Sequence, residues 1–362
     1  MNRGANARGL RLALVTVLML MSAGVRSESI DISRAFSMSS DYTTGDTFMQ
    51  IRLRGTVELI PAALNGIELH ELSGLAWAAD EKTLYAVSDA GFVAHLRPHF
   101  HDGNLIRVYL DAIHPLLGPD GTPVAKRLAD AEGLVARNAR NGVRDDTELI
   151  ISFETAPRIV HYTPRGEYLR ETALPLPLRE PDRYSARNRE LEALTEHDEF
   201  GLITGPERPL KNAHQSMITL YSVAGHSWLY RPIDPEHSAL VGLESMPGGD
   251  LLILERRFAS VFRPVIISLR RMRLHPPAFG DETPITDIAR FDSSRGWAID
   301  NFEGVARHEG SRYFIVSDDN DSPLQKTLLM YFEIGDNVAP FREADRLSGE
   351  ADDGSSWSHA PW

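Results

Sequence analysis

The sequence predicts an all-β protein, a β-propeller of five or six blades. One short motif occurs five times. In each copy a serine or glutamate begins a short apolar strand, and a second strand follows that ends in an acidic residue. The motifs begin at residues 73, 132, 192, 244 and 303, in steps of 59, 60, 52 and 59 residues. Repeats of about 50 residues with several short strands are typical of propeller blades. The chain after residue 27 has no long segment of helical periodicity, which excludes a helical solenoid.

Residues 1–27 have the composition of a secretory signal peptide. Three arginines precede an apolar run from Leu12 to Met21, and small residues follow up to Ser27. This run is only ten residues long, whereas a membrane-spanning helix needs about 20. The pattern therefore favours a cleaved signal over an uncleaved membrane anchor. We expect a periplasmic or secreted protein with no stable membrane span after cleavage.

The overall composition limits the classes of partner. The chain has 362 residues, of which 42% are hydrophobic, so it can bury a sizeable core. It contains no cysteine, so an exported form would have no disulfides. Its net charge of −13 argues against nucleic acid or an anionic membrane surface as a partner.

The ends of the chain differ from the repeats. Residues 28–47 form a polar N-terminal extension, and residues 48–60 alternate as a strand does. The last repeat stops at residue 334, one strand short. We therefore predict that the strand from 48–60 completes the last blade and closes the ring, which protects the sheet edges. The propeller domain then covers residues 48–335, and the acidic tail 336–362 is expected to be disordered.

Each repeat continues beyond its second strand with further strand-like segments. These segments lie at 92–96 and 105–110, at 158–162, at 215–221 and 227–231, at 264–269 and 285–289, and at 328–334. The long segments 174–189 and 270–300 leave room for a sixth blade.

Each repeat also marks two positions, one at the start of its first strand and one at the end of its second. In an antiparallel hairpin these positions lie side by side at one edge, and the ring of blades brings all of them to one end of the central channel. The pairs are Ser73 with Asp89, Glu132 with Glu154, Glu192 with Glu207, Glu244 with Glu255, and Glu303 with Asp318. Nine of these ten residues are acidic, so we predict an acidic channel mouth.

Carboxylates this close together raise one another's pKa unless protons, basic side chains or cations balance their charge. Ca²⁺ takes oxygen ligands, and we expect it as the cofactor. The expected metal ligands are Glu132, Glu192, Glu244, Glu303 and Asp318. In the structural alternative, the carboxylates accept backbone hydrogen bonds at their turns and form ion pairs with nearby arginines.

Four ordered motifs carry a family resemblance. They are Glu132-Gly133-Leu134, Asn188-Arg189-Glu190-Leu191-Glu192, Leu252-Ile253-Leu254-Glu255-Arg256 and Asn301-Phe302-Glu303-Gly304-Val305. In these motifs the chain resembles the phytase-like domain family, bacterial exported proteins also described as having "esterase-like activity of phytase". The resemblance covers roughly residues 65–335 and implies a β-propeller that hydrolyses phosphate or other esters. The metal-ligand pattern of the calcium-dependent propeller phytases does not match this sequence residue by residue.

Two functional hypotheses follow. The first is a calcium-dependent hydrolase of a phosphate or other ester, in which Arg158, Arg189 and Arg256 bind the ligand. The second is a non-catalytic periplasmic propeller that binds a small ligand or another protein. No catalytic residue is assigned, because the sequence has no Gly-x-Ser-x-Gly elbow, no His-Glu-x-x-His pair and no phosphate-binding Gly-x-x-x-x-Gly-Lys loop.

Overall fold

The computed structural model describes residues 29–335, apart from 187–189, 212, 261–262 and 275–281. The predicted signal peptide and the predicted disordered tail lie outside these residues. Among the residues described, no helix is long and apolar enough to cross a membrane.

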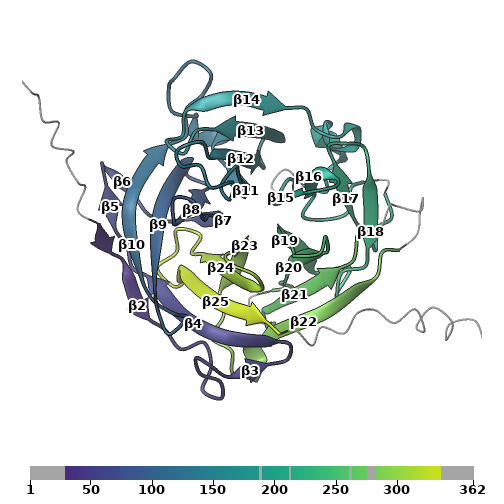
Figure 1. Ribbon diagram of the computed structural model, residues 1–362. Helices are drawn as coiled ribbons and strands as arrows, with labels where there is room; N and C mark the ends of the chain where they lie inside the picture. Colours follow the sequence, from purple (N-terminus) through teal and green to yellow (C-terminus); the bar gives the residue numbers. More distant parts are fainter. Residues whose placement is uncertain (1–28, 187–189, 212, 261–262, 275–281, 336–362) are drawn as a thin grey trace, which may run out of the picture.

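Five antiparallel sheets stand around a central channel, so the predicted propeller is confirmed with five blades (Figure 1). In each blade the first strand lies at the channel and the later strands lie progressively further out. Blade one contains β7 (Leu72–Ala78), β8 (Thr83–Ser88), β9 (Phe92–His101) and β10 (Asn104–Pro115). Blade two contains β11 (Ala131–Arg137), β12 (Glu148–Phe153), β13 (Arg158–Tyr162) and β14 (Tyr168–Thr172).

The other three blades repeat this order. Blade three contains β15 (Ala193–His197), β16 (Gly201–Gly205), β17 (Ile218–Ser222) and β18 (Ser227–Tyr230). Blade four contains β19 (Ser238–Ser245), β20 (Leu251–Arg257), β21 (Ile266–Met272) and β22 (Ile285–Asp292). Blade five contains β23 (Asn301–Arg307), β24 (Arg312–Asp318), β25 (Leu328–Ile334) and, from the N-terminal part of the chain, β4 (Ile51–Leu59).

The pairing of β4 with β25 closes the ring. It is antiparallel and runs from Leu328 opposite Glu58 to Ile334 opposite Ile51. Buried and more accessible residues alternate along β4, as its sequence predicts for an outer strand with one face on the core. The predicted closure of the last blade by an N-terminal strand is therefore confirmed.

The N-terminal extension also pairs with the propeller. The short strands β1 (Ile30–Asp31) and β2 (Ser33–Ala35) add to the outer edges of blades one and five, respectively. Between them Ile32 is fully buried. Two further short elements, β3 (Thr47–Phe48) on β4 and the hairpin β5–β6 (Ala63–Leu64 and Ile67–Glu68), complete this region.

The segments that could have held a sixth blade contain no extra sheet in the part that the structure describes. Residues 174–186 form a loop with two 3₁₀ turns, η2 (Leu176–Leu178) and η3 (Pro181–Arg183). The segment 270–300 supplies the outer strand β22 of blade four.

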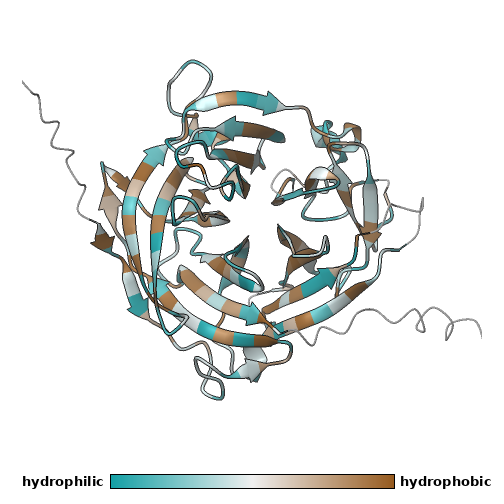
Figure 2. Cartoon of the chain, viewed as in Figure 1, coloured by the Kyte–Doolittle hydropathy of each residue, from teal (hydrophilic) through white to brown (hydrophobic). Residues whose placement is uncertain are grey.

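The core lies between the blades. Every residue of the inner strand β7 is buried, because neighbouring blades cover both of its faces. The outer strands instead alternate hydrophobic and hydrophilic residues, as the banding of β4 and β10 shows in Figure 2. This arrangement holds the starts of all five inner strands at one end of the channel.

Candidate functional site

The inner strands approach one another closely at a shared irregularity. Near its start, the pairing of the inner strand with the next strand shifts register in blades one, two, four and five. A glycine lies at each shift. A Cβ atom on Gly74 would lie 2.1 Å from the carbonyl oxygen of Glu132, and one on Gly304 would lie 2.3 Å from that of Ser73. Only glycine permits this contact between blades, and the channel narrows here to a throat of about 10 Å³.

Beyond this throat, three positions in each blade line one end of the channel. We call this end of the channel the acidic mouth. The first position pairs with the third: the carbonyl oxygens of Asp130 and Glu190 accept the backbone N–H groups of Glu154 and Glu207, both at 3.0 Å. The second position lies two residues after the first and lines the throat. The first positions are Glu71, Asp130, Glu190, Ala239 and Asn301. The second positions are Ser73, Glu132, Glu192, Val241 and Glu303. The third positions are Asp89, Glu154, Glu207, Arg256 and Asp318.

Two overlapping groups of carboxylates lie within this mouth. Asp89, Asp130 and Glu132 bring oxygen atoms within 4.8 Å of one another, and so do Glu132, Glu154 and Glu192. Glu132 is shared by both groups and only 6% of its surface is exposed. The described residues therefore contain two candidate cation sites side by side, built by blades one, two and three.

Burial and mutual repulsion raise the pKa values of four acids in these groups. Burial, followed by the neighbouring carboxylates, raises the pKa of Asp89, Glu132 and Glu192 well above their usual range. Burial and the nearby Asp130 raise the pKa of Glu154 to about 8, and Glu154 also shares a hydrogen bond with the Glu192 carboxyl group. That hydrogen bond needs a proton on one of the two acids. Without a cation, the mouth therefore retains protons at neutral pH.

The side of the mouth near blades four and five is balanced differently. Arg256 binds the carboxylate of Glu303 and the amide oxygen of Asn301, and lies 3.7 Å from Glu207. Burial opposes the charge of Arg256, but Glu303, Glu207 and Glu192 raise its pKa above the usual value. Here a guanidinium group supplies the positive charge that the other side lacks.

Asp318 lies in the mouth but outside both carboxylate groups. Burial, with the nearby Glu303, raises its pKa to about 8. Its carboxylate accepts the backbone N–H of Asn320 at 2.8 Å. Asp318 is thus a carboxyl group that changes protonation near neutral pH without belonging to either candidate cation site.

Blade four corrects the predicted register of the motif. Its irregularity falls at Val241-Gly242, whereas the prediction placed the motif at Glu244. Glu244 lies near the far end of β19, opposite Leu252, and lines the other end of the channel.

Glu255, the other expected acid of blade four, does not point into the acidic mouth. Its carboxylate binds the guanidinium of Arg270 at 3.0 Å and the backbone N–H of Ile233 at 2.7 Å. The next residue, Arg256, occupies the position at which the other blades have an acid. Blade four thus contributes no carboxylate to the three positions of the mouth.

The three expected ligand-binding arginines do not lie together. Arg256 lies in the mouth, whereas Arg189 lies outside the described residues. Arg158 lies over the ring of Phe153 at 3.9 Å and donates to the backbone carbonyls of Leu128, Thr155 and Ala156. It thereby ties together the two turns that carry Asp130 and Glu154.

Of the five expected metal ligands, the structure brings Glu132 and Glu192 into one candidate site. Glu303 and Asp318 share the mouth, and Glu244 does not. Asp130 was not predicted from the sequence, although it lies two residues before Glu132. The same offset holds Glu71 and Glu190, so a second acidic repeat was present in the sequence.

The chain is similar to one protein family and to solved structures. The sequence model of the phytase-like family, described as "esterase-like activity of phytase", matches residues 67–321. No curated protein matches the chain. Among solved structures, the β-propeller domain of Cps50 (Swd1) from Myceliophteria thermophila is similar, with 11% identity, a TM-score of 0.33, and coverage of 84% of this chain and 99% of that one. Since the family match spans more than half of the chain and includes the acidic mouth, the protein belongs to the phytase-like family.

Proposed function

We propose that the protein is an exported hydrolase of phosphate or other esters, with its active site at the acidic mouth and with Ca²⁺ as a cofactor. The observation that carries the proposal is the pair of carboxylate groups that share the buried Glu132. Perturbed, buried acids at the end of a channel are characteristic of functional sites. Export remains a prediction from residues 1–27.

The donor set fits a hard cation. Each group offers three carboxylates whose oxygens lie within 4.8 Å of one another, and oxygen ligands around Ca²⁺ at 2.3–2.6 Å lie at most about 5 Å apart. Asp89, Asp130 and Glu132 would hold one ion, and Glu132, Glu154 and Glu192 a second. A bound cation would polarise an ester oxygen and lower the pKa of a water molecule.

The chain's own residues supply the remaining requirements. Burial lets Asp89, Glu132, Glu154 and Glu192 keep protons, and these must leave when a cation binds, so cation binding releases protons. Asp318, with a pKa near 8, is suited to take or return a proton during hydrolysis. Arg256 is fixed by Glu303 and Asn301 and presents positive charge to an anionic group of a substrate.

Ester hydrolysis by the purified protein tests this proposal. Phosphate and carboxylic esters should be assayed with Ca²⁺ and with chelator, using wild type and Glu132→Gln. We expect turnover that requires Ca²⁺ and falls at least about 100-fold in Glu132→Gln, as for loss of a group that stabilises the transition state. The control is Glu309→Gln, an exposed carboxylate in the turn after β23.

The opposite result has a clear meaning. If no ester in the panel is hydrolysed while Ca²⁺ still stabilises the fold, the protein is a non-catalytic binding propeller. If turnover is unchanged by chelator and by Glu132→Gln, the acidic mouth is not the active site.

A further inference from the structure

Arg158 is the first residue of β13, at the mouth end of blade two. It lies opposite Phe153, the last residue of β12, and Phe153 lies opposite Ala131, the first residue of β11. These three neighbours form a row across the blade. Asp130 directly precedes this row on β11 and Glu154 directly follows it on β12, so Arg158 lies beside the turns that carry both carboxylates.

The guanidinium of Arg158 joins these two turns through backbone carbonyl groups. It donates to the carbonyl oxygen of Leu128, two residues before Asp130. It also donates to the carbonyl oxygens of Thr155, at 3.2 Å, and Ala156, at 3.1 Å, in the turn that follows β12. One side chain therefore holds both turns.

Arg158 acts on the backbone and not on the carboxylates. Its guanidinium lies 3.9 Å from the centre of the Phe153 ring and forms no ion pair with a residue that the structure describes. Burial lowers the pKa of Arg158. An arginine that served as a counter-charge would bind a carboxylate directly, as Arg256 binds Glu303. Since the positive charge of Arg158 would by itself repel a cation, any gain in cation affinity must come from the position of the turns.

The turns that Arg158 joins place one carboxylate of each candidate cation site. The backbone N–H of Glu154 donates to the carbonyl oxygen of Asp130 at 3.0 Å, and the hydroxyl of Thr155 donates to the Asp130 carboxylate at 2.9 Å. Ala156 has a φ of 62°, in the left-handed region, and such a residue persists only where its surroundings hold it. The hydrogen bond from Arg158 to its carbonyl oxygen is one such contact.

This arrangement is particular to blade two. In the other four blades the third strand begins with an apolar residue, Phe92, Ile218, Ile266 or Leu328. Blade two also supplies three of the five carboxylates in the two candidate sites, Asp130, Glu132 and Glu154. The arginine thus stands in the blade that contributes most to both sites.

We propose that Arg158 is a positioning residue for the two candidate cation sites. It fixes the turns of Asp130 and Glu154 at the separation that cation binding needs, and so raises the affinity for Ca²⁺ although it carries a positive charge. This inference rests on the proposed function in one respect, the binding of Ca²⁺ at the acidic mouth. Residues that orient metal ligands typically change metal affinity by about 10–100-fold.

Calorimetric titration of the full chain with Ca²⁺ tests this role. Arg158→Lys keeps the charge but loses the planar fork of donors, and Arg158→Met loses both. We expect both variants to bind Ca²⁺ at least about tenfold more weakly than wild type. If Arg158 acted through its charge, Arg158→Lys would bind as wild type does and Arg158→Met would bind more tightly. Either result would overturn the proposal.

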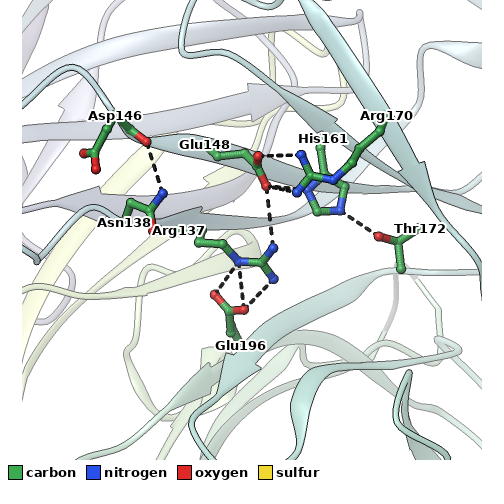
Figure 3. A network of polar contacts seen from close by, with 8 residues as sticks. All are labelled: Arg137, Asn138, Asp146, Glu148, His161, Arg170, Thr172 and Glu196. Carbon is green, nitrogen blue, oxygen red and sulfur yellow. Dashed lines mark hydrogen bonds and ion pairs between the residues drawn. The ribbon is translucent and has the colours of Figure 1, made fainter.

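Arg137 provides the matched control, because it lies at the other end of the same blade. It is the half-buried last residue of β11, where it binds Glu196 and lies 3.6 Å from Glu148 in the network of Figure 3. Arg137→Met should lower the melting temperature and leave the affinity for Ca²⁺ unchanged. Equal weakening of Ca²⁺ binding by Arg137→Met and Arg158→Met would show that the stability of blade two sets the affinity, against the proposal.

Thr155→Val keeps the test open should the Arg158 variants fold poorly by their melting curves. Thr155 is exposed, and its replacement removes the hydrogen bond to the Asp130 carboxylate without changing the core. Ca²⁺ affinity should fall about tenfold at one of the two sites, as for loss of a hydrogen bond to a charged group. Unchanged affinity at both sites would contradict the positioning of Asp130 by this turn.

The titration separates this inference from the proposed hydrolase activity. A wild type that binds Ca²⁺ but hydrolyses no ester rejects the hydrolase and leaves the role of Arg158 standing. Arg158 variants that bind Ca²⁺ as wild type does reject only the role of Arg158. A wild type that binds no Ca²⁺ overturns both.

Discussion

Blades two and four have the same backbone and opposite electrostatics. Both have four antiparallel strands, a register shift near the start of the inner strand and a glycine at that shift. At the three positions of the acidic mouth, blade two has Asp130, Glu132 and Glu154, whereas blade four has Ala239, Val241 and Arg256. The comparison separates two requirements of the repeat. Glycine and register build the channel in both blades, while the side chains at the three positions differ: blades one, two and three form the candidate cation sites, and blade four supplies a guanidinium group.

The largest effect should come from pH in chelated protein. Burial and its neighbouring acids raise the pKa of Glu154 in blade two from an ordinary value near 4.5 to about 8. The folded state then binds more protons than the unfolded state between these pH values. The free energy of unfolding should therefore fall as pH rises from about 4.5 to about 8, by up to about 1.4 kcal/mol per pH unit for each such group.

Denaturant unfolding with chelator at several pH values measures this slope. Glu154→Gln should flatten it, because the amide does not titrate. Added Ca²⁺ should restore stability most at the highest pH, where the acids are ionised. A slope that is the same in wild type and Glu154→Gln would show that Glu154 does not contribute to the pH dependence of stability.

The next effect concerns the cation of blade four. Arg256→Met removes the guanidinium that binds Glu303, and leaves that carboxylate in a site where only 8% of the residue is exposed. Breaking a buried ion pair at one partner costs about 3–5 kcal/mol. Thermal melts should show this loss at pH 7. The double variant Arg256→Met, Glu303→Gln should recover much of it, and failure to recover would mean that Arg256 acts through packing instead.

Calcium should stabilise the fold by a smaller amount. At a hundredfold excess over its dissociation constant, a ligand that binds only the folded state adds about 2.7 kcal/mol. Glu132→Gln, which alters both carboxylate groups, should abolish this gain, while Glu309→Gln should keep it. The measurement is the melting temperature with Ca²⁺ and with chelator. If the wild-type melting temperature is the same with Ca²⁺ and with chelator, the charge of the acids is balanced by protons and arginines and not by Ca²⁺.

The comparison also explains how far the sequence could predict this protein. Repeated apolar strands and the missing last strand predicted five or six blades and closure by an N-terminal strand, because both follow from local patterning and edge protection. Acids in blades two, three and five located the mouth. The prediction for blade four was wrong because it was based on carboxylates. Glu244 fitted the motif by its charge, whereas the register shift lies at Gly242, which has no charged side chain.

Side-chain direction could not be predicted from the motif either. Glu255 and Arg256 are neighbours on one strand, so they point to opposite faces of the sheet. Only the register of β19 and β20 decides that Arg256 faces the mouth and Glu255 faces Arg270. The cavity of about 450 Å³ at the other end of the channel was not predicted, because Arg140, Asp198, Glu244 and Arg307, which line it, come from different blades and share no motif.

The smallest effect tests what blades two and four have in common. A Cβ atom on Gly133 would lie 2.5 Å from the backbone nitrogen of Leu194, and one on Gly242 would lie 2.7 Å from the carbonyl oxygen of Glu303. Both contacts are with the backbone of the next inner strand, so Gly133→Ala and Gly242→Ala should each destabilise the fold by about 1–3 kcal/mol, as overpacking does. Denaturant unfolding measures both losses. Gly242→Ala should keep its stabilisation by Ca²⁺, since blade four supplies no carboxylate to the candidate sites. A tolerated Gly242→Ala beside a damaging Gly133→Ala would show that the glycine serves the cation sites and not the channel.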